Sequence, residues 1–342
     1  MRLATRLALL LLSLLASIPA SRAEDQPFFK GKQLRLLLST GVAGSYSQYG
    51  RALARHFGDH LAGKPDMIVE SMPGGGGLIA ANYLYFSAPK DGTTLGLVYS
   101  TVPLAPLFGI PQARFEALKF NWLGSIAAAD GVCAAWHDAP IKSWSDMLTK
   151  EFIVGGAGPA NSTAIYPAVL NKLFGTKIKV VNGYNNGDAI FLAMERGEVQ
   201  GRCGPLLNAV RTTRPDWLPQ HKIVLPIVID EARYPEFPDT PAILEFTKDD
   251  KTRAQLRLMM LMQHMDHPMM LPPEVPAERV AALRVAFDAT MTDPGFLEDA
   301  AKLRIPISPV DGKGLAQALA EAYALPADVV AAAKESIGAM GD

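Results

Sequence analysis

The sequence predicts an α/β protein with two lobes, in which mainly parallel sheets are flanked by helices. Apolar runs typical of strands alternate along the chain with segments of helical spacing, a pattern that favours parallel sheets. A strand, a glycine-containing loop and a helix occur twice, at residues 36–57 and 152–174. Between the two copies, a long and nearly uncharged run at residues 121–136 predicts a strand that passes from one lobe to the other.

The elements expected before this run are strands and helices in alternation. Tyr46, Tyr49, Leu53 and Phe57 fall on one helical face. The expected elements are, in order, a strand at residues 36–38, a helix at 48–57, a strand at 67–70, a helix at 78–87 and a strand at 94–99.

The same alternation continues after the run. Pro167 is expected to kink a helix or to delay its start, and Asp188 can cap the next helix. The expected elements are a strand at residues 152–154, a helix at 164–174, a strand at 178–181, a helix at 189–196 and a strand at 223–229 that returns to the first lobe. Further helices are expected at residues 252–264, 277–292, 295–302 and 314–324.

The order of these elements predicts a discontinuous first lobe. Residues 24–125 and 227–342 would form this lobe, and residues 126–226 would form the second lobe. Two strands crossing between the lobes would act as a hinge, an arrangement typical of clamshell binding proteins.

Residues 1–23 have the pattern of a cleaved signal peptide. Arg2 and Arg6 precede an apolar run at residues 7–15, and small residues near Ala23 provide a cleavage site. A membrane anchor is the alternative, but the apolar run is shorter than the ~20 residues that a span requires. We therefore expect an exported protein.

The charge balance and the cysteine content further narrow the class of protein. The chain has 33 basic and 34 acidic side chains, and this balance argues against a nucleic-acid partner. The only cysteines are Cys133 and Cys203, which could form a disulfide outside the cytoplasm or remain two buried thiols. Both alternatives stay open at this point.

The two glycine loops are candidate anion sites. The first N–H groups of a helix lack partners within the helix, and the helix dipole adds partial positive charge at that end. Hydroxyl and amide residues in the loops, such as Ser45 and Asn161, could instead serve only as helix caps. Two such loops on opposite lobes would hold one anionic ligand between them.

Three other features are candidates for ligand contact. The loop at residues 184–187 follows a strand, where ligands of open α/β sheets bind. The glycines at residues 74–77 could form a ligand loop or a flexible turn. Arg202 could bind a carboxylate through two hydrogen bonds, or it could form a salt bridge at the end of a strand.

Enzyme and cofactor motifs are missing from the sequence. It contains no phosphate-binding loop, dinucleotide-binding fingerprint, nucleophile elbow or His-Glu-x-x-His motif. Residues 259–270 contain six methionines together with His264 and His267, which could bind copper or could belong to a core helix. We expect no catalytic residue, no metal and no cofactor.

Four stretches of the sequence carry a family resemblance. The chain resembles the extracytoplasmic receptors of tripartite tricarboxylate transporters, the Bug-type solute-binding proteins. The stretches are Gly-Ser-Tyr-Ser-Gln-Tyr-Gly-Arg at residues 44–51, the glycine-rich 72–84 with 88–92, Gly-Tyr-Asn-Asn-Gly at 183–187 with 193–199, and the proline-containing 272–284 with 293–296.

The resemblance implies a type II periplasmic binding-protein fold whose lobes close over a small carboxylate. It implies a monomeric periplasmic receptor that works with integral membrane transporter subunits. The family commonly has acidic residues where this chain has Ser47 and Gln200 or Gly201. The ligand contacts implied by position are Val42, Ala43, Gly44, Ser45, Ser47, Ser100, Thr101, Asn161, Ser162, Thr163, Tyr184, Asn186 and Gly187.

Three other functions remain open from the sequence. The same fold could pass a ligand signal to a membrane sensor instead of a transporter. The chain could also be a secreted hydrolase or a metal-binding protein.

Overall fold

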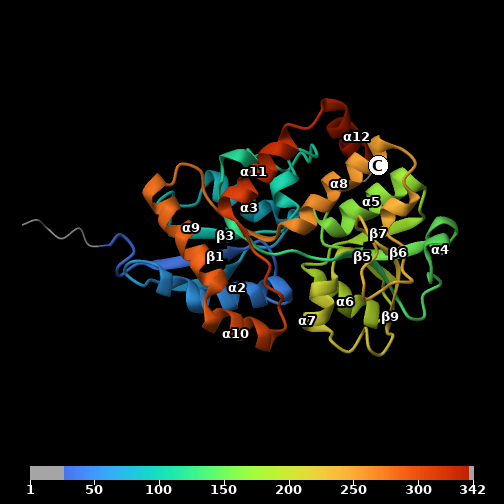
Figure 1. Cartoon of the computed structure of the whole chain (residues 1–342), viewed down its shortest axis with the longest axis horizontal. Helices are drawn as coiled ribbons and strands as arrows, with labels where there is room; N and C mark the ends of the chain where they lie inside the picture. Colours follow the sequence, from blue (N-terminus) through green and yellow to red (C-terminus); the bar gives the residue numbers. More distant parts are fainter. Residues whose placement is uncertain (1–26, 339–342) are drawn as a thin grey trace, which may run out of the picture.

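Two β-sheets organise the chain in the computed structural model, which describes residues 27–338. The predicted signal peptide therefore lies outside the described residues. Figure 1 shows the sheets in two lobes that lie side by side, with helices around each. The two-lobed α/β architecture predicted from the sequence is confirmed.

The first sheet has the strand order β11-β4-β10-β3-β1-β2. Its strands are β1 (Gln33–Leu38), β2 (Asp66–Ser71), β3 (Thr94–Leu97), β4 (Asn121–Ala127), β10 (Asp266–Leu271) and β11 (Val310–Asp311). Helices that pack on this sheet or on each other beside it are α2 (Ser45–His56), α3 (Leu78–Phe86), α9 (Ala277–Thr292), α10 (Pro294–Leu303) and α11 (Gly312–Tyr323).

The second sheet has the strand order β7-β6-β8-β5-β9. Its strands are β5 (Gly131–Trp136), β6 (Phe152–Gly156), β7 (Ile178–Asn182), β8 (Gly201–Pro205) and β9 (Ile223–Val228). Helices that pack on this sheet or on each other beside it are α4 (Trp144–Thr149), α5 (Ser162–Phe174), α6 (Gly187–Glu195), α7 (Leu207–Thr213), α8 (Asp250–His264) and α12 (Ala327–Gly338). Short 3-10 helices cover Phe57–His60, Gly75–Gly77, Val102–Leu104, Ala117–Lys119 and Ile243–Phe246.

The sheets are mixed, and not mainly parallel as the sequence predicted. In the first sheet β1 pairs in parallel with β2 and β3, whereas β10 runs antiparallel to β3 and β4. In the second sheet β6 is parallel to β7 and β8, and β5 is antiparallel to β8 and β9. The antiparallel strands include those next to the segments that cross between the lobes.

The crossing segments differ in part from the prediction. The run at residues 121–136 does pass between lobes, but it divides into β4 in the first sheet and β5 in the second. The return strand was misplaced, because β9 stays at the edge of the second sheet. The chain instead enters the first sheet through β10. The exact lobe boundaries at residues 126 and 227 remain a prediction.

Gln263 links the segments that connect the two lobes. Its side-chain oxygen accepts a hydrogen bond from the Gly131 N–H at 3.2 Å, and its amide nitrogen donates to the Ile229 carbonyl at 2.7 Å. Its backbone carbonyl also accepts from the Ala129 N–H at 2.9 Å. One buried side chain therefore fixes the start of β5 and the end of β9 relative to the end of α8.

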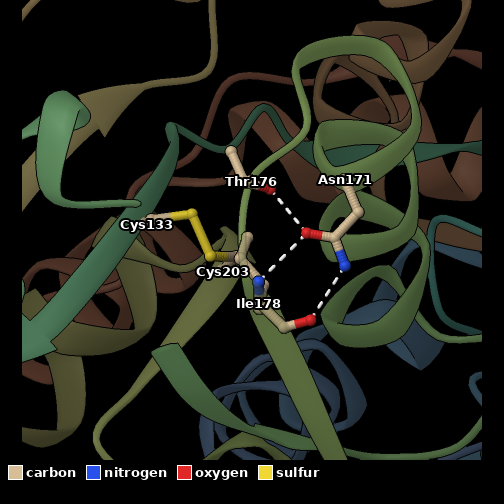
Figure 2. Close-up of a disulfide and its surroundings, with 5 residues drawn as sticks. All are labelled: Cys133, Asn171, Thr176, Ile178 and Cys203. Carbon is tan, nitrogen blue, oxygen red and sulfur yellow. Dashed lines mark hydrogen bonds between the residues drawn. A yellow bond between two sulfur atoms is a disulfide. The ribbon is translucent and has the colours of Figure 1, made fainter. Parts of the chain in front are cut away.

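The cysteines form a disulfide between neighbouring strands. Cys133 of β5 lies directly opposite Cys203 of β8, with 4.0 Å between their Cα atoms. Figure 2 shows this bond beside the α5–β7 turn. There the Asn171 side chain accepts from Thr176 Oγ1 at 2.6 Å and donates to the Ile178 carbonyl at 2.8 Å. Of the two alternatives for the cysteines, the structure has the disulfide.

The methionine-rich segment at residues 259–270 spans the end of α8 and the strand β10, so it is only partly the expected helix. Its six methionines are buried, with Met269 in one hydrophobic core and the others in a second. His264 is exposed whereas His267 is buried. The methionines fill core space, and the segment does not present them as one ligand face.

Two further features bear on the predictions. The helix α5 begins at Ser162, so Pro167 lies inside it and does not delay its start.

Within residues 27–338, no helix has the length and apolar character that a membrane span requires.

Candidate functional site

A pocket lies between the lobes, where strands of both sheets end. Its unfilled space is about 670 Å³, part of it open to solvent. The first lobe contributes residues that follow β1 and β3, and the second contributes residues that follow β6 and β7. Predicted residues that line the pocket are Ala43, Gly44, Ser45, Ser100, Asn161, Ser162, Asn186 and Gly187.

The first glycine loop leaves the start of α2 without a capping side chain. Gly44 is the N-cap residue, with a φ of 89° that glycine adopts without strain. Because glycine has no side chain, it cannot accept from the first N–H groups of the helix. The nearby hydroxyl of Ser39 does not cap α2 either, because it accepts from the Tyr99 N–H at 3.0 Å. The N-terminus of α2 therefore faces the pocket as a potential anion site.

The second glycine loop is held by its own side chains. Asn161 caps α5 by accepting from the Thr163 N–H at 3.1 Å and from the Thr163 hydroxyl at 2.8 Å. The same hydroxyl accepts from the Ala157 N–H at 2.9 Å. Thr163 thus stabilises the loop through its hydrogen bonds, whereas Asn161 and Ser162 line the pocket.

Five predicted contact residues do not line the pocket. Val42 is 67% exposed, and the other four lie below the surface or against the second-lobe core. These residues are Val42, Ser47, Thr101, Thr163 and Tyr184. The assignment of these residues as ligand contacts remains a prediction.

Arg202 is the buried cation of the pocket. Its side chain comes from β8 and is only 8% exposed, yet its Nε and Nη1 atoms have no hydrogen-bond partner within the described residues. Its Cζ atom lies 4.9 Å from the centre of the Phe191 ring. Burial lowers the pKa of Arg202 to about 10, and nearby Tyr99 and Asp266 oppose this shift. Of the two roles considered for Arg202, the salt bridge is absent from the described structure.

Asp266 and two aromatic residues form the first-lobe wall of the pocket. Asp266 is 5% exposed, and its Oδ1 accepts from the Tyr46 hydroxyl at 2.9 Å. His267 Nδ1 lies 2.9 Å from Oδ2, and the His267 ring stacks on Tyr46 with 3.9 Å between ring centres. Burial raises the pKa of Tyr46 well above its usual value, and the Asp266 charge raises it further.

Tyr99 adds an unpaired hydroxyl to this wall. Its ring meets Tyr46 edge to face at 5.0 Å, and its buried hydroxyl has no hydrogen-bond partner within the described residues. Burial raises the pKa of Tyr99 to about 12, so the hydroxyl is a neutral donor.

This wall was not predicted from the sequence. Tyr46 was expected on an apolar helical face, and Asp266 and His267 lay in the stretch considered for copper or a core helix. A useful signal was the position of the adjacent polar residues Asp266 and His267 between methionines of this run.

The tetraglycine stretch at residues 74–77 does not line the pocket but contacts the opposite lobe. A Cβ built at Gly76 would stand 2.8 Å from the Ala160 carbonyl carbon and 2.8 Å from the Asn161 nitrogen. Gly76 also has a φ of 66°. Its lack of a side chain therefore lets the lobes approach each other beside the pocket.

Comparisons with known proteins agree with this architecture. No family model matches the chain. A curated relative from Cupriavidus necator, described as a "UPF0065 protein in gbd 5'region", is 25% identical over 294 residues, covering 84% of this chain and 83% of its own length. The periplasmic binding protein BugD superposes with a TM-score of 0.69 at 16% identity, over 89% of this chain and 97% of BugD. The chain has the fold of the Bug-type periplasmic binding proteins.

Two other structures with this Bug-type fold contain ligands. MatC from Rhodopseudomonas palustris, with bound malate, has a TM-score of 0.68 at 18% identity and covers 89% of this chain and 98% of MatC. A second R. palustris protein, with adipate, has a TM-score of 0.66 at 16% identity. The superposition covers 90% of this chain and 97% of the R. palustris chain. The resemblance drawn from the sequence is thus confirmed at the level of the fold.

Proposed function

We propose that the chain is a periplasmic receptor that closes its two lobes over a small carboxylate. The observation that carries this proposal is that Arg202, a buried guanidinium in the inter-lobe pocket, has two nitrogen atoms without a hydrogen-bond partner among residues 27–338. An isolated buried charge is strongly destabilising unless a counter-charge approaches it. A carboxylate fits a guanidinium through two parallel hydrogen bonds, which makes it the simplest counter-charge.

The open N-terminus of α2 provides a second group that favours an anion. Its first N–H groups face the same pocket, and the helix dipole gives that end partial positive charge. Arg202 belongs to the second sheet and α2 to the first lobe. A ligand that touches both favours the closed state by its greater affinity for that state.

The remaining parts of the proposal follow from the family resemblance. We propose that the receptor is exported through residues 1–23, binds without catalysing a reaction, acts as a monomer and delivers its ligand to an integral membrane transporter. The malate and adipate in the similar structures support a carboxylate as the ligand class.

Thermal-shift measurements with mono-, di- and aminocarboxylates test this function. Stabilisation by a ligand grows with its concentration relative to its dissociation constant. At least one carboxylate should raise the melting temperature of the wild-type protein, and Arg202→Gln should remove that shift. Arg257→Gln is the matched control, because Arg257 pairs with Glu231 outside the pocket. An unchanged shift in Arg202→Gln would contradict the assignment of the carboxylate to this residue.

A further inference from the structure

The pocket contains opposite charges that come from different sheets. Arg202 projects from β8 of the second sheet, and Asp266 is the first residue of β10 in the first sheet. Both side chains are more than nine-tenths buried. They do not form an ion pair with each other in the described structure. A ligand between the lobes therefore meets a cation on one side and a carboxylate on the other.

Asp266 retains capacity to accept hydrogen bonds. An ionised carboxylate has about four lone-pair sites. Tyr46 donates to Oδ1, and His267 Nδ1 is the one nitrogen of the described residues within ion-pair distance of Oδ2, at 2.9 Å. No Lys or Arg side chain forms an ion pair with Asp266 in the described part of the chain. A cationic donor from the ligand would satisfy the remaining acceptor sites.

We infer that the ligand is a zwitterion, with a carboxylate bound by Arg202 and an ammonium group bound by Asp266. This inference rests on the proposed function, since it assigns the ligand class of the same pocket. A second carboxylate, as in malate or adipate, would face Asp266 and be repelled by its charge. The pocket thus selects an amino acid-like ligand over a dicarboxylate.

The aromatic wall supports the same orientation. Tyr46 and Tyr99 line the pocket beside Asp266, and the faces of aromatic rings attract cations. The unpaired Tyr99 hydroxyl can donate to the ligand carboxylate, because its proton remains bound at neutral pH. The ammonium end of the ligand then lies towards β10 and the carboxylate end towards β8.

Isothermal titration calorimetry with chain-matched ligands tests the inference without any mutation. The amino compounds are L-alanine, β-alanine and γ-aminobutyrate, and the matched acids are propionate, butyrate, malonate and succinate. At least one amino compound should bind at least about tenfold more tightly than the acids of similar length, the ratio expected for one charge-assisted hydrogen bond. Asp266→Asn should remove this preference while retaining an acceptor for the Tyr46 hydroxyl. Asp216→Asn, whose side chain pairs with Lys222 outside the pocket, should keep it.

The outcomes separate the inference from the proposed function. If dicarboxylates bind as tightly as the amino compounds and Arg202→Gln abolishes their binding, the receptor function stands and the zwitterion inference is wrong. An unchanged preference in Asp266→Asn also overturns the inference. If none of these carboxylates binds, both the inference and the proposed function fail.

Discussion

Arg202 lies directly against the backbone of Gly187, so that a Cβ built at Gly187 would stand 2.8 Å from Arg202 Cζ. Gly187 is the first residue of α6, and Arg202 comes from β8. The loop after β7 therefore needs a glycine because the guanidinium occupies the space of a side chain. Two residues that are 15 positions apart in the sequence thus line one pocket in direct contact.

Replacing Gly187 by alanine should displace the guanidinium. Gly187→Ala is expected to weaken ligand binding by about tenfold or more, because the new methyl group overlaps Arg202 and shifts its paired hydrogen bonds. The urea midpoint should change little. Gly314→Ala, in the first turn of α11 and outside the pocket, is the control. Wild-type affinity in Gly187→Ala would show that the position of Arg202 does not matter for binding.

Arg202 should reduce the stability of the unliganded protein. Burial lowers its pKa to about 10 from 12.5, so its charge is unfavourable to folding at every pH below about 10, and this penalty shrinks as the pH rises from 10 to 12.5. Arg202→Met should therefore stabilise the unliganded protein by about 1–3 kcal/mol in urea denaturation at pH 7. The same variant should show no stabilisation by ligand. A less stable Arg202→Met protein would mean that Arg202 has a structural partner.

Contact between Gly76 and the second glycine loop should control closure. Gly76→Ala is expected to favour the open form and weaken ligand binding, since its Cβ would stand 2.8 Å from the Ala160 carbonyl carbon. Gly75→Ala is a matched control, because Gly75 also has a positive φ of 58° but its Cβ would meet nothing closer than 3.8 Å. Small-angle scattering with saturating ligand should report a larger radius of gyration only for Gly76→Ala. Equal radii in both variants would argue against this contact as a determinant of closure.

Removing the disulfide should affect both stability and binding. Cys133 and Cys203 are 70 residues apart in the chain, and a crosslink over that separation stabilises by about 4 kcal/mol in the chain-entropy estimate. Urea denaturation should show that the double variant Cys133→Ala/Cys203→Ala has lost much of this free energy of unfolding. It should also bind ligand more weakly, because Cys203 adjoins Arg202 on β8. A double variant with unchanged affinity would limit the disulfide to a role in stability.

The architecture was predictable from local patterns. The repeated strand, loop and helix and the run at residues 121–136 depend on neighbouring residues, so their sequence periodicity is sufficient. The strand β10 was missed because its methionines favour helices and it lacks β-branched residues. That omission also hid Asp266 and His267, which the fold brings beside α2.

The site was predictable only in part. Glycine loops such as the one around Gly44 could be recognised because a helix start and its loop are adjacent in sequence. The role of Arg202 could not be decided, since it depends on whether a distant carboxylate folds against it. Likewise, nothing local to residues 74–77 indicates that Gly76 meets Ala160 across the cleft.

A crystal structure with the carboxylate that most raises the melting temperature tests the central claim most directly. The account predicts closed lobes with the ligand carboxylate accepting hydrogen bonds of about 2.7–2.9 Å from Arg202 Nε and a terminal Nη atom. A carboxylate bound elsewhere, with the Arg202 guanidinium still unpaired or bonded to protein, would contradict it.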